Sequence, residues 1–153
     1  MSPEPVEILF VEDNPADVEL TLRALKNAHI ANRIQVVQDG EQALDFLFRR
    51  GDHEGRRGDA LPRLVLLDLK LPKVDGLEVL RQVREDPRTR TLPVVILTSS
   101  KEERDLVSGY ELGANSYIQK PVDFTQFQET VQQLGLYWLV INEPPPVPVG
   151  VQE

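Results

Sequence analysis

The chain contains no cysteine among its 153 residues. This absence excludes a disulfide framework, a thiol nucleophile and a cysteine-based metal site, and it leaves nothing that marks an oxidising compartment. No apolar run approaches the roughly 20 residues that a membrane-spanning helix needs, and the first residues lack the basic and apolar regions of a signal peptide. We therefore expect a cytoplasmic protein without a membrane partner.

Positive charge is also scarce, because 17 Lys and Arg residues stand against 25 Asp and Glu residues and give a net charge of -8. Such a balance disfavours general binding to nucleic-acid phosphates, so nucleic acid is not an expected partner. Hydrophobic residues make up 41% of the chain and charged residues 27%, which is typical of a globular domain. The composition therefore predicts one folded unit.

The most informative stretch is the apolar run over residues 64–67, which lies between Pro62 and Pro72 and is followed directly by Asp68. The run is too short for a typical helix and is typical of a strand that is buried on both faces. In an open parallel sheet, ligands bind beyond the carboxyl ends of the strands. Asp68 is therefore our candidate for the reactive residue.

Similar short apolar runs alternate with helical repeats along the chain. The other expected strands span residues 6–11, 34–37, 94–97 and 116–119, and each expected strand is followed by a helix. Five helix starts carry a capping residue followed three places later by an acid or amide: Asn14 with Asp17, Asp39 with Gln42, Asp75 with Glu78, Ser100 with Glu103, and Asp123 with Gln126. A strand–helix unit repeated five times predicts a doubly wound α/β fold, a parallel sheet with helices on both faces.

In such a sheet, five polar residues are brought to one edge: Glu12, Asp13, Asp68, Thr98 and Lys120. Two like charges about 4 Å apart repel by roughly 4 kcal/mol at an effective dielectric constant near 20, so the carboxylates favour a bound cation. Carboxylates without soft ligands suit Mg²⁺. A nucleophilic carboxylate, a hard cation and hydrogen-bond donors are the parts that accept a phosphoryl group.

Four motifs carry a resemblance to a known family: VEDNP at 11–15, LLDLKLPKVDGLEVL at 66–80, LPVVILTSS at 92–100 and GANSYIQKP at 113–121. Over residues 6–134 the chain resembles the response-regulator receiver domains of two-component signalling. Within that family it is similar to the stand-alone, single-domain regulators that partner bacterial phytochrome histidine kinases. The resemblance implies a flavodoxin-like, five-stranded sheet in the order 2-1-3-4-5.

The resemblance also implies site roles. Asp68 would take a phosphoryl group from a phosphohistidine of a sensor histidine kinase, while Thr98 and Lys120 would bind phosphoryl oxygens. Four groups would hold Mg²⁺: the carboxylates of Glu12, Asp13 and Asp68, and the backbone carbonyl of Lys70. Thr98 and Tyr117 stand at the family's conformational switch positions, and the bond from Lys120 to Pro121 is expected to be cis. The chain would then be a phosphoacceptor that signals through a changed surface, and not an enzyme acting on a separate substrate.

Two departures and three alternative functions remain open. Glu12 stands where many family members have Asp, and Lys70 places a charged side chain near the expected phosphoryl site. A phosphohydrolase that works through an aspartyl phosphate would need a second acid where this chain has Lys70. A flavodoxin-like cofactor binder would need glycines where residues 12–15 read Glu-Asp-Asn-Pro, with two acids and no glycine. A receiver-like interaction module without phosphotransfer is the third alternative.

The C-terminal part has a different composition. We expect a receiver domain over residues 1–135 and an extension over 136–153, with an unbroken apolar run at 136–141 and a proline-rich segment at 144–148. Exposed aromatic side chains favour association surfaces, so we predict a homodimer with Tyr137 and Trp138 in the contact. The alternative is that the run folds back on its own domain after Gly135. With no output domain after residue 135, signalling is expected to proceed through protein binding.

Overall fold

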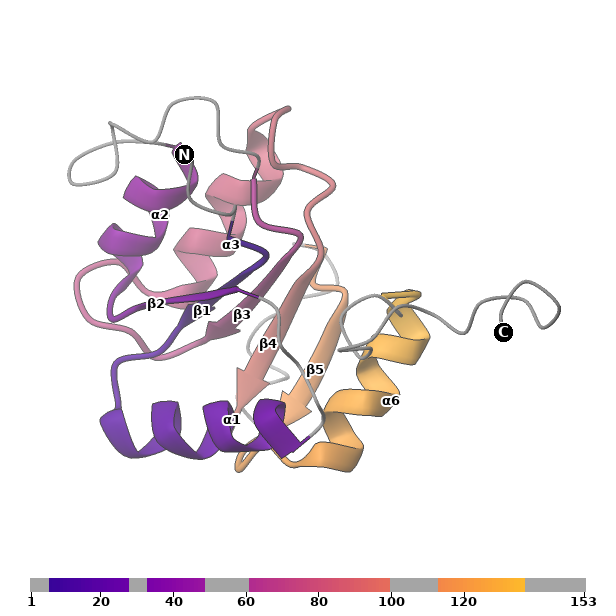
Figure 1. The fold of residues 1–153 in the computed structure, drawn as a ribbon. Helices are drawn as coiled ribbons and strands as arrows, with labels where there is room; N and C mark the ends of the chain where they lie inside the picture. The colour runs from indigo at the N-terminus through magenta and orange to yellow at the C-terminus, as the bar shows by residue number, and fades with distance from the viewer. Residues whose placement is uncertain (1–5, 28–32, 49–60, 100–112, 137–153) are drawn as a thin grey trace, which may run out of the picture.

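The computed structural model describes residues 6–27, 33–48, 61–99 and 113–136. Within these residues there are five strands: β1 (Ile8–Val11), β2 (Ile34–Val37), β3 (Leu64–Asp68), β4 (Val94–Thr98) and β5 (Ser116–Gln119). The described helices are α1 (Pro15–Asn27), α2 (Gly40–Phe48), α3 (Gly76–Glu85) and α6 (Phe124–Leu134), as Figure 1 shows. None of these helices has the length and apolarity needed to cross a lipid bilayer.

The strands form one parallel sheet in the order β2-β1-β3-β4-β5, which confirms the order expected from the resemblance. β1 and β3 end side by side, with Val11 opposite Leu67, and β4 and β5 end side by side, with Thr98 opposite Gln119. All neighbouring strands run in the same direction, so the residues that follow them reach the same edge of the sheet.

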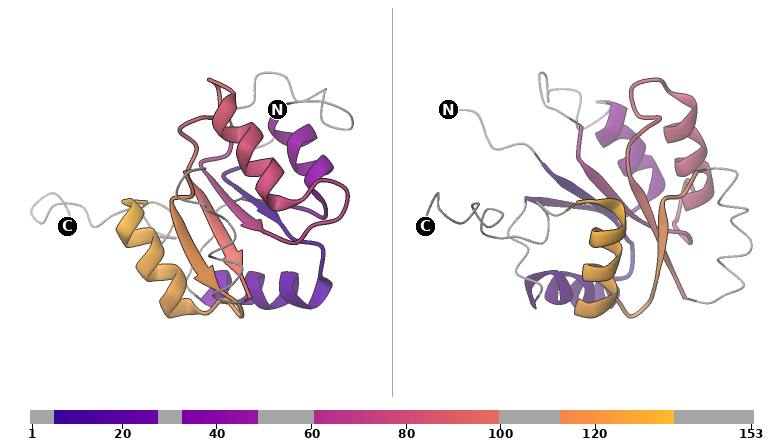
Figure 2. Two further views of the ribbon diagram at one scale, coloured as in Figure 1. Left: turned by 180° about the vertical axis from the view of Figure 1, so that it is seen from behind. Right: turned by 90° about the vertical axis from the view of Figure 1, so that its right-hand side faces the viewer.

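Helices cover both faces of the sheet, as the doubly wound prediction requires. The right-hand view of Figure 2 shows α2 and α3 on one side of the sheet, and α1 and α6 on the other. Alternate strand residues enter the two cores: Leu9 packs in the cluster beneath α2 and α3, and Phe10 packs in the cluster beneath α1 and α6. Every residue of β1, β3 and β4 is buried, which explains why these strands are continuous apolar runs in the sequence.

The predicted helix caps are confirmed at four of the five starts. In each of the four, a side-chain oxygen of the cap accepts the backbone N–H three residues later: Asn14 from Asp17 at 3.2 Å, Asp39 from Gln42 at 2.7 Å, Asp75 from Glu78 at 3.0 Å, and Asp123 from Gln126 at 2.8 Å. Each cap stabilises the fold by about 1 kcal/mol. The predicted start at Ser100 lies outside the described residues, as does the helix expected after it.

The end of α6 bears on the predicted extension. Gly135 has a φ of 73°, a left-handed conformation that terminates the helix, and the next N–H, that of Leu136, donates to the Val131 carbonyl at 2.9 Å. Leu136 then packs against the core beneath α1 and α6. The apolar run therefore begins on its own domain, and the proposed dimer contacts Tyr137 and Trp138 lie outside the described residues.

Candidate functional site

Asp68 is the last residue of the central strand β3, and only 5% of its surface is exposed. The loop that follows it is closed by a hydrogen bond, in which the N–H of Gly76 at the start of α3 donates to the Leu69 carbonyl at 2.9 Å. The approach is so close that a Cβ atom on Gly76 would lie 2.4 Å from the backbone oxygen of Asp68. The packing of α3 therefore fixes the backbone that carries the candidate reactive carboxylate.

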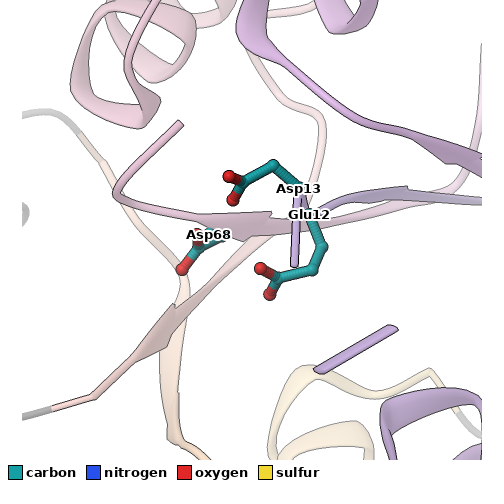
Figure 3. Close-up of side chains that lie close together, drawn as sticks. All are labelled: Glu12, Asp13 and Asp68. Carbon is teal, nitrogen blue, oxygen red and sulfur yellow. The ribbon is translucent and has the colours of Figure 1, made fainter. Parts of the chain in front are cut away.

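Two further carboxylates follow β1 and face Asp68. Glu12 is buried with 1% of its surface exposed, whereas Asp13 is exposed to solvent. One carboxylate oxygen from each of Glu12, Asp13 and Asp68 lies within 4.8 Å of the other two. Figure 3 shows the three carboxylates gathered around one space at the ends of β1 and β3. The predicted acidic cluster is therefore formed.

Lys120 approaches this cluster from the residue after β5. Its Nζ atom lies 2.8 Å from Glu12 Oε1, 3.0 Å from Asp68 Oδ1 and 3.1 Å from Asp17 Oδ2. Its backbone N–H donates to the Thr98 carbonyl at 2.7 Å, and the bond to Pro121 is cis, as expected. Burial alone would lower the pKa of Lys120, but its contacts with Glu12 and Asp68 outweigh burial and raise it. The ammonium group therefore stays charged.

Burial has the opposite effect on Glu12. Burial raises the pKa of Glu12, and the contact with Lys120 lowers it. The negative charge of Asp68 raises it further. The net direction is upward. Burial of the Glu12 carboxylate, together with the charge of Asp68, therefore outweighs the stabilisation of its charge by Lys120.

The donor set fits a hard divalent cation. Three carboxylates supply oxygen ligands of the kind that Mg²⁺ prefers, and their combined charge exceeds that of the single Lys120 ammonium. Beside them a cleft of about 530 Å³ is lined by Asp13 and by residues of the loop between β3 and α3, including the exposed Lys70. The cleft therefore opens beside Asp13, the exposed member of the acidic cluster.

Comparison with known proteins identifies this arrangement. The family model for the response regulator receiver domain matches residues 8–132 of the chain. The chain belongs to this family. The match spans the whole described sheet, so the receiver domain includes every strand end that forms the site.

Individual relatives of the receiver are similar over most of their length. Probable methanogenesis regulatory protein FilR2 from Methanothrix harundinacea is 46% identical over 93% of this chain and 89% of its own. Response regulator Rcp1 from Synechocystis is 38% identical over 88% of this chain and 90% of its own, and the crystal structure of its Mn²⁺-bound form has a TM-score of 0.70 over 92% of this chain and 99% of that one. The bacteriophytochrome response regulator RtBRR is 54% identical, with a TM-score of 0.83 over 94% of this chain and 86% of that one.

The two predicted switch residues lie on neighbouring strands of the receiver. Thr98 ends β4 with 2% of its surface exposed, and its carbonyl accepts the Lys120 N–H described above. Tyr117 lies on β5 opposite Ile96, where it is half-buried and packs against the core beneath α2 and α3. The structure thus places Thr98 at the site edge and Tyr117 one strand further out.

The loop that carries Lys70 is held by residues to which the sequence analysis gave no functional role. Lys73 has a φ of 69°, and its Nζ lies 3.8 Å from Asp39 and 3.6 Å from Glu41 at the start of α2. Gly40 also abuts this loop, since a Cβ there would lie 1.8 Å from the Val74 carbonyl oxygen. The first turn of α2 therefore packs against the loop that carries Lys70.

Asp17 is the site residue whose role the sequence analysis missed. Its position in the first turn of α1 indicated only a partner for the Asn14 cap, and its backbone N–H does donate to Asn14. Its carboxylate also reaches Lys120, 103 residues away in sequence. The one signal in the sequence was its spacing of four residues from Asp13, which places the side chain one helical turn beyond the acidic loop.

Proposed function

We propose that this receiver accepts a phosphoryl group on Asp68 from a phosphohistidine of a sensor histidine kinase. The observation that carries the proposal is the contact of 3.0 Å between Lys120 Nζ and Asp68 Oδ1 beside two further carboxylates at the strand ends. An isolated carboxylate at this buried position would destabilise the folded chain. A lysine and a cation site beside it supply the positive charges that a transferring phosphoryl group needs.

The proposed transfer is an in-line displacement at phosphorus. A carboxylate oxygen of Asp68 forms a P–O bond while the P–N bond to the kinase imidazole breaks, and the electron pair of that bond stays on the imidazole nitrogen. Asp68 needs no general base because its carboxylate carries no proton to remove. Lys120 would compensate charge on the phosphoryl oxygens, and the Thr98 hydroxyl would donate a hydrogen bond from the next strand end.

Mg²⁺ would be held by Glu12, Asp13 and Asp68 together with the carbonyl of Lys70. When bound, it would neutralise charge that builds up on the phosphoryl oxygens. The metal in the Mn²⁺-bound form of Rcp1, a similar protein, supports a divalent ion in this receiver as well. Glu12 is buried and already paired with Lys120, whereas Asp13 is exposed. We therefore expect Asp13 to contact the ion more directly than Glu12 does.

Signalling would follow from a change of surface. Phosphorylation would draw Thr98 toward the new oxygens and let Tyr117 turn inward, and a few kcal/mol of differential interaction is enough to shift a two-state population. Similarity to RtBRR supports a kinase of the phytochrome class as the phosphoryl donor. We further propose that residues 1–135 form the receiver domain and that the extension beyond them mediates homodimerisation through Tyr137 and Trp138.

The decisive experiment is phosphorylation by acetyl phosphate with Mg²⁺, followed by intact mass spectrometry. We expect one added phosphoryl group on the natural chain and none on Asp68→Asn. Asp86→Asn is the matched control, because Asp86 is an acid that caps the far end of α3 and pairs with Arg88. It should be modified like the natural chain.

Three outcomes would contradict the proposal. Full modification of Asp68→Asn would move the acceptor elsewhere, and an unmodified natural chain would favour the interaction module without phosphotransfer. Multiple turnover of a phosphoester substrate would favour the phosphohydrolase.

A further inference from the structure

The charge of the Lys120 ammonium group is shared among three carboxylates, and this group donates a hydrogen bond to Asp17. A lysine has three N–H donors, and three carboxylate oxygens of the described residues lie within 3.1 Å of Nζ: those of Glu12, Asp17 and Asp68. A phosphoryl group on Asp68 takes the place of the Asp68 carboxylate beside Lys120, and its oxygens then compete with Glu12 and Asp17 for the ammonium charge. The identity of the contact that is lost therefore affects how strongly a phosphoryl group is held.

The three carboxylates differ in how readily they can leave. Transfer of a phosphoryl group to Asp68 removes the carboxylate charge of Asp68, so its contact with Lys120 is replaced. The side chain of Glu12 is 1% exposed, so Glu12 would remain buried without its counter-charge. The side chain of Asp17 is 30% exposed and lies in the first turn of α1, where water can replace the lysine. Asp17 is therefore the partner that Lys120 can release at the least cost.

We infer that Asp17 is a positioning residue that competes with the phosphoryl group for Lys120 and so weakens the phosphorylated state of this receiver. The inference rests on the proposed function of Asp68. In the free chain Asp17 holds the ammonium at one side of the acidic cluster through a 3.1 Å hydrogen bond. When Asp68 carries a phosphoryl group, Lys120 leaves Asp17 and binds a phosphoryl oxygen.

The test measures binding of beryllofluoride, an anion that mimics a phosphoryl group on a carboxylate, in the presence of Mg²⁺. Asp17→Asn keeps the shape of the side chain and removes the competing charge. Because partly exposed ion pairs are weak, we expect the concentration at half-saturation to fall by about two- to fivefold. Amide NMR signals of the strand ends report the saturation.

Glu19→Gln provides a matched control on the same helix. Glu19 is 73% exposed and pairs with Arg23 at 3.4 Å, so this variant removes the same charge without touching Lys120. Its half-saturation concentration should equal that of the natural chain. An equal gain in both variants would show that net charge alone is responsible, and would overturn the role of Asp17.

A second readout follows the side-chain ammonium signal of Lys120, assigned by its loss in Lys120→Arg. We expect Asp17→Asn to shift this signal in the ligand-free chain, whereas a purely structural role of Asp17 would leave it in place. Normal beryllofluoride binding by the natural chain with no gain in Asp17→Asn would overturn the inference alone. No binding by the natural chain would overturn the phosphoacceptor function and the inference together.

Discussion

Gly76 offers a direct test of how the backbone supports the phosphoacceptor. Replacing it with alanine would place a Cβ atom 2.4 Å from the Asp68 carbonyl oxygen, 2.8 Å from Leu69 Cα and 2.9 Å from the Leu69 carbonyl oxygen. All three contacts are with backbone atoms, so no change of side-chain rotamer relieves them. The start of α3 and the end of β3 must therefore separate by about 1 Å to reach ordinary contact distances.

The cost of Gly76→Ala follows from two opposing effects. Overpacking of this kind costs about 1–3 kcal/mol, and alanine recovers at most about 1 kcal/mol through its better helix propensity. We expect a net loss of about 1–2 kcal/mol in the free energy of unfolding, measured by urea denaturation. A displacement of about 1 Å at a reacting group can slow its chemistry by about 100-fold, so phosphorylation by acetyl phosphate should slow by about 10- to 100-fold.

Gly135→Ala is the control for this prediction. Gly135 has a positive φ of 73°, and a Cβ atom added there would meet no other atom within 4 Å, so alanine strains the backbone without touching the site. It should cost about 1 kcal/mol of stability and leave the phosphorylation rate unchanged. If Gly76→Ala were phosphorylated at the natural rate, the contact between α3 and Asp68 would not position the acceptor.

Three further predictions concern charge and assembly. Lys120→Met should lower the free energy of unfolding by about 3–5 kcal/mol in urea, because it leaves buried Glu12 without its counter-charge, and adding Glu12→Gln should restore part of the loss. Burial would lower the pKa of Lys120, but its contacts with Glu12 and Asp68 outweigh burial and raise the pKa above 10.5. The stability that the charged Lys120 contributes is therefore fully present below pH 10.5 and is lost as the pH rises through the raised pKa. In the presence of a chelator, the natural chain should lose more stability over that pH range than Lys120→Arg. Light scattering at micromolar concentration should find a dimer for the full chain and a monomer for a chain ending at Leu134, and a monomer for both would contradict the proposed dimer.

Much of the fold could be predicted from local sequence. The strands are buried on both faces, so they are continuous apolar runs, and the helix starts at Asn14, Asp39, Asp75 and Asp123 carry caps that bond within three residues. Parallel strands all point one way, so a polar residue after each run predicted a shared edge. Glu12, Asp13, Asp68 and Lys120 could be assigned to one site on this basis, before any distance was known.

Only the tertiary structure decided how the charges at that edge are shared. The pairing of Lys120 with Asp17 joins the first helix to the residue after the last strand, and no local pattern marks a contact across 103 positions. The burial of Glu12 beside an exposed Asp13 depends on how β1 sits between β2 and β3. The need for glycine at position 76 arises from the approach of α3 to the Asp68 backbone. These features depend on distances between separate elements, and packing of the whole sheet with its helices sets those distances.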